Sequence, residues 1–89
     1  MTGRINLYAA EKRRGFAVIS APGISLLESL GIRAGTRVSV QHRYAFGGPV
    51  LLRVEDAYTV ALGKDVAKQI EVAELAAEQI NAAGNRAAV

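Results

Sequence analysis

Three consecutive segments in which apolar and polar residues alternate constrain this fold more than any other feature of the sequence. In residues 37–43, 50–55 and 58–62 the apolar side chains recur at every second position, which is the period of a half-buried β-strand. The first connection contains Gly47 and Gly48, which permit a tight reversal, and then Pro49, which suits the first residue of a strand. We therefore expect antiparallel strands that follow one another along the chain.

The same alternation predicts which side chains of these strands face the core. The expected inner residues are Val38, Val40, His42, Val50, Leu52, Val54, Tyr58, Val60 and Leu62. The expected outer residues include Arg37, Ser39, Gln41, Arg43, Leu51, Arg53 and Glu55. Each of these strands is therefore expected to bury one face and to expose the other.

The flanking segments predict a first strand, two short helical segments and a final strand. Residues 15–20 are apolar and partly β-branched, which is typical of a strand, and a turn at Gly35 precedes the alternating region. Residues 24–30 have helical spacing and end at a glycine, Gly31, that can adopt the left-handed conformation. Residues 63–70 return to helical spacing before a last strand around 71–72.

This order predicts a mainly β fold, a small barrel of about five strands. One short α-helix is inserted after the first strand, a short helical turn precedes the last strand, and a C-terminal helix is a further option. Closure of the barrel would remove exposed strand edges.

The length of 89 residues is enough for one domain. We expect a basic N-terminal segment at 1–14, a barrel domain at 15–73 and an alanine-rich, partly helical tail at 74–89. The tail would dock on the barrel, pair with another copy to give a homo-oligomer, or fray as a terminus.

The absence of cysteine excludes several classes of site. A disulfide framework, a thiolate zinc or iron–sulfur site and a cysteine nucleophile all require residues that this chain lacks. No apolar run approaches the roughly 20 residues that span a bilayer, and residues 1–14 are basic where a signal peptide is apolar. We therefore expect a cytoplasmic protein that does not span the membrane.

The net charge of +3 raises the possibility of nucleic-acid binding. Only Lys12, Arg13 and Arg14 run together, however, and the other basic residues are spread among eight acidic ones. A scattered positive balance of this kind usually serves solubility, so we expect a solvated surface and no nucleic-acid partner.

The sequence contains no convincing catalytic or metal-binding constellation. His42 is the single histidine, and a structural role is commoner than a ligand role for a histidine on an apolar face. No second histidine or cysteine would complete a transition-metal site with it, so His42 is a weak candidate at most. Glu55 and Asp56 are adjacent in a turn, where both carboxylates stay solvated. We therefore expect neither an enzyme nor a required cofactor.

The hairpin around Gly47 is the most informative surface. Arg43, Tyr44, Phe46 and Arg53 would cluster there, and aromatic residues interleaved with arginine either stack on single-stranded bases or anchor a protein interface. The structural alternative is that Tyr44 and Phe46 cap the barrel mouth. Leu51 is predicted to point outward, although a single exposed leucine is ordinary.

Four motifs in a fixed order carry a resemblance to a known family. They are Leu27-Glu28-Ser29-Leu30-Gly31-Ile32, Ala34-Gly35-Thr36-Arg37-Val38, Gly47-Gly48-Pro49-Val50-Leu51-Leu52-Arg53-Val54, and Ala61-Leu62-Gly63-Lys64-Asp65-Val66-Ala67 leading into Ile70-Glu71-Val72. In this order they resemble the FeoA family over residues 15–73. The residues before Gly15 lack the leucine-rich opening of that family, and the tail after Ala73 is longer than a barrel needs.

The resemblance implies a Src-homology-3-like β-barrel and a role in bacterial ferrous iron uptake. It implies a soluble accessory or regulatory protein that binds the cytosolic part of FeoB, the membrane transporter with a GTP-binding domain. The partner-binding candidates are Leu26, Arg43, Tyr44, Phe46, Leu51 and Arg53, and the structural turn residues are Gly31, Gly35, Gly47, Gly48 and Pro49. Ferrous or another transition metal is associated with the family, but no residues here match a coordinating set.

Two alternatives remain open at the level of sequence. A small basic barrel that binds RNA or DNA would need its arginines and aromatic residues on one face. A transition-metal-responsive regulatory domain would use His42 with carboxylates such as Glu28 or Glu55, and it would need His42 to reach solvent.

Overall fold

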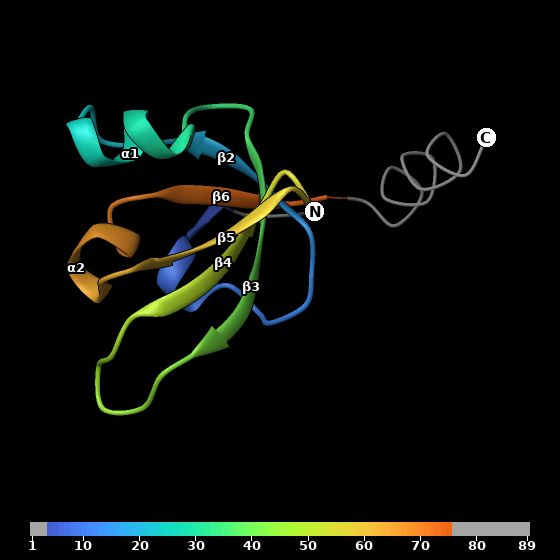
Figure 1. Ribbon diagram of the computed structural model, residues 1–89. Coiled ribbons are helices and arrows are strands. Elements are labelled where there is room, and N and C mark those ends of the chain that lie inside the picture. Colours follow the sequence, from blue (N-terminus) through green and yellow to red (C-terminus); the bar gives the residue numbers. More distant parts are fainter. Residues whose placement is uncertain (1–3, 76–89) are drawn as a thin grey trace.

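The computed structural model describes residues 4–75, so the predicted C-terminal helix lies outside the described residues. The elements run in the order β1 (Arg4–Asn6), η1 (Leu7–Ala9), β2 (Phe16–Ser20), α1 (Ser25–Leu30), β3 (Arg37–Arg43), β4 (Val50–Val54), β5 (Tyr58–Leu62), α2 (Lys64–Ala67) and β6 (Glu71–Glu74) (Figure 1). η1 is a single 3-10 turn, and α1 and α2 lie at the same end of the strands. Within the described residues no helix is long and apolar enough to cross a membrane.

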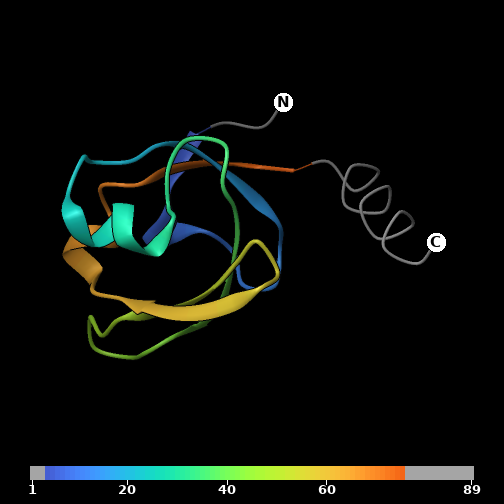
Figure 2. The same ribbon diagram turned by 45° about the horizontal axis from the view of Figure 1, so that its top comes forward.

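The strands form one antiparallel sheet in the order β1-β6-β2-β3-β4-β5, which curves around the core (Figure 2). The predicted mainly β fold with an inserted helix and a helical turn before the last strand is confirmed. Two details differ from the expectation. The sheet has six strands because β1 precedes the predicted set, and the strand order leaves β1 and β5 as edges where closure was expected.

Residues 4–14 are part of the folded body in the structure, although the sequence set residues 1–14 apart. β1 pairs with β6, with Ile5 opposite Val72, and the Leu7 amide donates to the Ile70 carbonyl at 2.8 Å. Leu7 and Ala10 are both fully buried in the core. This segment therefore contributes a strand and core packing.

The core lies between the inner face of the sheet and the two helices. Its large, fully buried side chains come from nearly every element: Leu7, Val18, Leu27, Ile32, Val40, Val50, Leu52, Val54, Leu62, Ile70 and Val72. The alternation in β4 is confirmed, because every second residue from Val50 to Val54 has no exposed surface. Tyr58 departs from its predicted inner position, since it is partly exposed at the start of β5.

A β-bulge corrects the predicted orientation of His42 and Arg43. Val40 pairs with Leu52, but the register shifts before His42, which pairs with Leu51. The extra residue reverses the alternation, because side chains change face at every position of a strand. His42 is consequently exposed, and Arg43 turns inward opposite the buried Val50.

The α1 helix ends at Gly31 with the predicted left-handed closure. Gly31 has a φ of 78°, its amide donates to the Glu28 carbonyl, and the Ile32 amide donates to the Leu27 carbonyl at 2.9 Å. Ile32 is buried, which provides the hydrophobic contact that accompanies such helix ends.

Substituting alanine for Gly31 is expected to lower the free energy of unfolding by about 1 to 2 kcal/mol. The new methyl group would sit 3.1 Å from the Tyr58 hydroxyl on a left-handed backbone. Urea denaturation of Gly31→Ala and of the control Gly23→Ala would measure the effect. A methyl group at Gly23 meets nothing within 4 Å, so that variant should resemble wild type. Equal loss of stability in both variants would contradict the role of the left-handed closure.

Candidate functional site

The β3–β4 hairpin, residues 44–49, closes with two backbone hydrogen bonds. The Tyr44 amide donates to the Pro49 carbonyl at 3.0 Å, and the Gly48 amide donates to the Ala45 carbonyl at 3.2 Å. Phe46 and Gly47 are the central residues of this tight turn, and both have positive φ, 61° and 73°. Such turns join antiparallel strands well but strongly prefer asparagine, aspartate or glycine at both central positions. Phe46 is therefore an unusual residue for its backbone conformation.

Glycine suits position 47 because of its positive φ, whereas position 48 needs glycine because there is no room for a side chain. A Cβ atom at Gly48 would lie 2.8 Å from the Tyr44 Cβ atom and 3.2 Å from the Ala45 carbonyl oxygen. No side chain fits at that distance, so the hairpin needs glycine there because of close backbone approach. The predicted pair of turn glycines therefore serves two separate functions.

Phe46 and Tyr44 present the aromatic surface of the hairpin to solvent. Phe46 has a relative exposure of 105%, and Tyr44 has one of 46%. The predicted capping of a barrel mouth by Phe46 is excluded by this exposure, because a side chain that caps a core loses surface to it. The exposed His42 ring meets the Tyr44 ring edge to face at a centroid distance of 4.5 Å. The hairpin thus carries an aromatic cluster that is open to solvent.

Tyr8 and Lys64 support the base of the hairpin, and the sequence did not predict this role for either residue. The Tyr8 hydroxyl donates to the Gly48 carbonyl at 3.1 Å. The cationic groups of Arg43 and Lys64 lie 5.7 Å and 5.6 Å from the centre of the Tyr8 ring, within reach of a cation–π interaction. Tyr8 was missed because residues 1–14 offered no periodic pattern that would tie them to the sheet.

Arg43, a predicted partner-binding residue, makes contacts within its own chain that support the hairpin. Its guanidinium donates to the Ala10 carbonyl, and its buried Nε atom has no hydrogen-bond partner among the described residues. Arg43 thereby ties the end of β3 to the segment after η1, while part of its side chain remains accessible.

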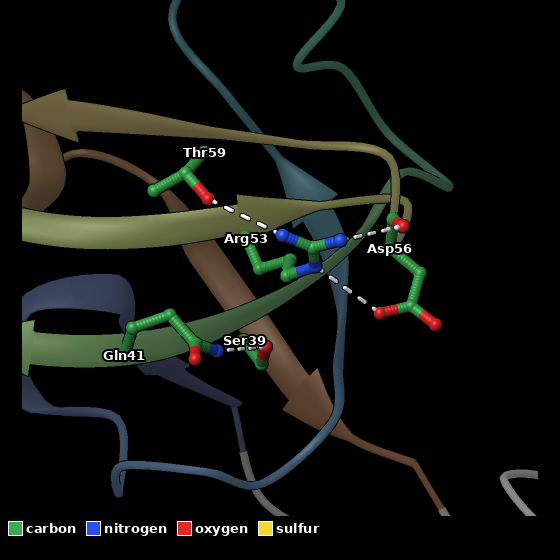
Figure 3. A network of polar contacts seen from close by, with 5 residues as sticks. All are labelled: Ser39, Gln41, Arg53, Asp56 and Thr59. Atoms are coloured by element: carbon green, nitrogen blue, oxygen red, sulfur yellow. Dashed lines mark hydrogen bonds and ion pairs between the residues drawn. The ribbon is translucent and has the colours of Figure 1, made fainter.

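The outer face of the β3–β4–β5 region brings the predicted residues Leu51 and Arg53 together on β4. Leu51 is half-buried and pairs with the exposed His42 next to the hairpin. Arg53 lies further from the hairpin. It contacts Asp56 of the β4–β5 turn at 3.4 Å and Thr59 of β5 at 3.5 Å (Figure 3). Leu51 is therefore close to the aromatic cluster, whereas Arg53 is engaged with the β4–β5 turn.

Leu26 is separate from this cluster. It is 51% exposed on α1, beside the exposed Ile24. Both views place α1 and the β3–β4 hairpin on opposite sides of α2 (Figures 1 and 2). The predicted contact residues therefore divide between two surfaces. Tyr44, Phe46 and Leu51 form one, which we call the hairpin surface, and Leu26 belongs to another.

His42 reaches solvent, as the metal-responsive alternative requires, but its proposed partners lie elsewhere. Glu55 is in the β4–β5 turn, where its carboxylate accepts a hydrogen bond from the Arg37 amide at the opposite end of β3. Glu28 belongs to α1. Among residues 4–75, no three His, Cys, Asp or Glu side chains lie close enough together to hold a metal ion.

Several basic side chains of the described surface are paired with carboxylates. Ion pairs join Arg4 to Glu71, Arg14 to Glu11 and Glu74, Arg37 to Glu55, and Arg53 to Asp56. A hydrogen bond and attraction from Glu74, with a smaller contribution from Glu11, raise the pKa of Arg14. Since Arg43 turns inward and Arg53 is paired, these two arginines do not join Phe46 on one phosphate-binding face.

Comparisons with known proteins identify the domain. Residues 21–74 match the family described as the FeoA domain. The solution structure of a FeoA-like protein from Clostridium acetobutylicum is 30% identical, with a TM-score of 0.71, and the match covers 85% of this chain and 92% of that one. A sequence comparison with curated proteins gives no match.

Two other structures share the fold. The crystal structure of an iron uptake regulatory protein (FeoA) is 22% identical, has a TM-score of 0.73 and matches over 82% of this chain and 99% of that one. A manganese-dependent transcriptional repressor is 25% identical, also with a TM-score of 0.73, over 84% of this chain. The match spans only 44% of the repressor, so this chain resembles one part of that protein.

Proposed function

Since this chain belongs to the FeoA family of small accessory domains in ferrous iron transport, we propose that it acts by binding the cytosolic part of the membrane transporter FeoB. In this proposal the protein is cytoplasmic and regulates uptake by docking, without catalysing a reaction or requiring a cofactor. The hairpin surface, formed by Tyr44, Phe46 and Leu51, is the proposed contact region.

The observation that carries the proposal is the conformation and exposure of Phe46. A bulky residue at a φ of 61° costs on the order of 1 kcal/mol. Burial normally offsets such a cost, but Phe46 has a relative exposure of 105% and gains no packing within its own chain. An exposed aromatic side chain on a strained turn is therefore best explained by contact with another molecule.

The surroundings of Phe46 match the usual composition of a protein-binding hot spot. Such sites combine aromatic anchors with nearby cationic residues at the rim. Here Tyr44 and the half-buried Leu51 supply further apolar area, and Lys64 lies at the base of the hairpin. The hydrogen bond from Tyr8 to Gly48 fixes the hairpin in place, which reduces the entropy lost on binding.

The proposal is tested by measuring binding to FeoB from the same organism in nanodiscs, with and without a GTP analogue. We expect saturable binding that changes little between low and high salt, because apolar docking is weakly screened. Leu51→Glu should weaken this binding at least about tenfold, because a carboxylate in an apolar contact must be desolvated.

Leu26→Glu is the matched control, because it makes the same change at an exposed leucine on α1, away from the hairpin surface. It should bind FeoB like wild type. Equal weakening by both variants would show that the contact region is not confined to the hairpin surface. Absence of binding in every nucleotide state would refute docking on FeoB, and steep loss of binding with salt would point to a phosphate-driven interaction instead.

A further inference from the structure

The β5 strand is an uncharged sheet edge. Among the strands of residues 4–75 it pairs with β4 alone, and the sequence Tyr58-Thr59-Val60-Ala61-Leu62 contains neither a charge nor a proline. Its register with β4 runs without a bulge. Natural proteins usually protect such edges with charges, prolines or bulges, because an open edge is a template for another strand. β5 carries none of these protections within its five residues.

The direction of the backbone groups shows what this edge offers. The Glu55 amide donates to the Arg37 carbonyl at 2.8 Å, so the odd-numbered residues of β4 point toward β3 and the even-numbered ones toward β5. Their partners on β5 are Tyr58, Val60 and Leu62. The amide and carbonyl groups of Thr59 and Ala61 therefore point away from the sheet.

The two ends of this edge carry opposite charges. Asp56 precedes β5, and its side chain is 97% exposed although it contacts Arg53. Lys64 follows β5 as the first residue of α2. Its exposed side chain places the ammonium 5.6 Å from the Tyr8 ring centre, and it has no ion-pair partner among the described residues. Between them the chain is neutral.

We propose that β5 pairs with β5 of a second copy of this chain, antiparallel and about a two-fold axis at Val60. In this register Thr59 lies opposite Ala61 of the second copy, and Ala61 opposite its Thr59. All four free backbone groups on each strand then have partners, which gives four hydrogen bonds between the copies. The result is a symmetric dimer with a sheet that continues from one subunit into the other.

Charge complementarity selects a second copy in this register. The two-fold axis at Val60 places position 56 opposite position 64 of the second copy, and it does so twice in the dimer. The exposed side chains of Asp56 and Lys64, which contact Arg53 and Tyr8 within one chain, would turn toward each other across this axis. A parallel arrangement would instead bring like charges together at both ends. If the axis moves to Thr59, the outward backbone groups of Ala61 have no partner in β5 of the second copy, and if it moves to Ala61, those of Thr59 have none. Either shift also moves Asp56 away from Lys64 of the second copy. The register at Val60 alone satisfies both the backbone groups and the charges.

Sedimentation equilibrium of the full chain tests this dimer. Wild-type protein should associate in a concentration-dependent manner as a monomer and dimer. Asp56→Lys and Lys64→Asp each place like charges together and should raise the dimer dissociation constant by roughly fivefold or more. The double variant restores unlike pairs between the copies, so it should regain most of the wild-type association. Failure of this rescue would overturn the proposed register.

Ala61→Pro tests the backbone pairing without a change of charge. Proline removes an amide that points outward, so β5 keeps its hydrogen bonds to β4 while the dimer loses two donors. Association should fall below detection, and circular dichroism should show an unchanged fold. Should this variant unfold, Ala61→Lys, an exposed edge charge, replaces it. A dimer that survives these substitutions, or a wild-type chain that stays monomeric up to its solubility limit, would refute the proposal.

Discussion

Replacing Phe46 with asparagine is expected to stabilise the fold while weakening binding to FeoB at least about 30-fold. Phe46 has a φ of 61° and Gly47 one of 73°, and asparagine followed by glycine is strongly preferred for such a turn. Relief of the strain should raise the free energy of unfolding by about 0.5 to 1 kcal/mol. Removal of the exposed ring should weaken the free energy of binding to FeoB by about 2 kcal/mol or more, as is typical of a hot-spot residue.

Urea denaturation and the nanodisc binding assay measure the two effects on the same variant. Asp56→Gly is the matched control, because Asp56 has a φ of 59° in the other hairpin turn and lies outside the hairpin surface. Because aspartate already tolerates a left-handed backbone, this variant should gain little stability, and it should leave FeoB binding unchanged. A Phe46→Asn variant that binds like wild type would refute the anchor role, and loss of binding in the control as well would trace the effect to backbone rigidity.

Truncating Leu52 to alanine is expected to lower the free energy of unfolding by about 3 kcal/mol. Leu52 has no exposed surface and lies between Val40 of β3 and Val60 of β5, so the deletion leaves a cavity in the middle of the sheet. A chain of 89 residues has a total stability of roughly 4 to 13 kcal/mol, so this loss is a large part of it.

Leu51→Ala provides the comparison within the same strand. Leu51 is half-buried on the outer face, so its truncation should cost about 1 kcal/mol or less. Urea denaturation of both variants gives the difference directly. Similar losses at the two positions would mean that the core is not organised around the inner face of β4. The same Leu51→Ala variant should still weaken FeoB binding, because its contact with the partner is lost.

The order of elements was predictable because apolar periodicity changes clearly along the chain. The alternation around Val50, Leu52 and Val54 and the helical spacing before Gly31 each correspond to an observed element. β1 was not predictable in this way, since three residues are too few to show a period. Its position depends instead on tertiary contacts such as the burial of Leu7.

The candidate contact residues were partly predictable from the sequence. Where their predicted positions differ from those in the structure, the cause is local backbone geometry. The sequence identified Tyr44 and Phe46 as hairpin residues, and both are exposed there. It placed His42 inward because a one-residue bulge leaves no trace in residue type, yet that bulge reverses every following side chain. The left-handed conformation of Phe46 was equally hidden, since the sequence indicated only that Gly47 and Gly48 permit a tight reversal.

The pairing of β1 with β6 also places the first and the last strand of the sheet side by side. Arg4 lies opposite Ala73, so the chain enters and leaves on neighbouring strands (Figure 1). A domain of this kind can be fused to, or inserted in, another protein with little disturbance of its core. An affinity tag or surface tether attached through either strand will emerge at the same place. Since β6 leaves on the side away from the β3–β4 hairpin, such a tether keeps Phe46 accessible.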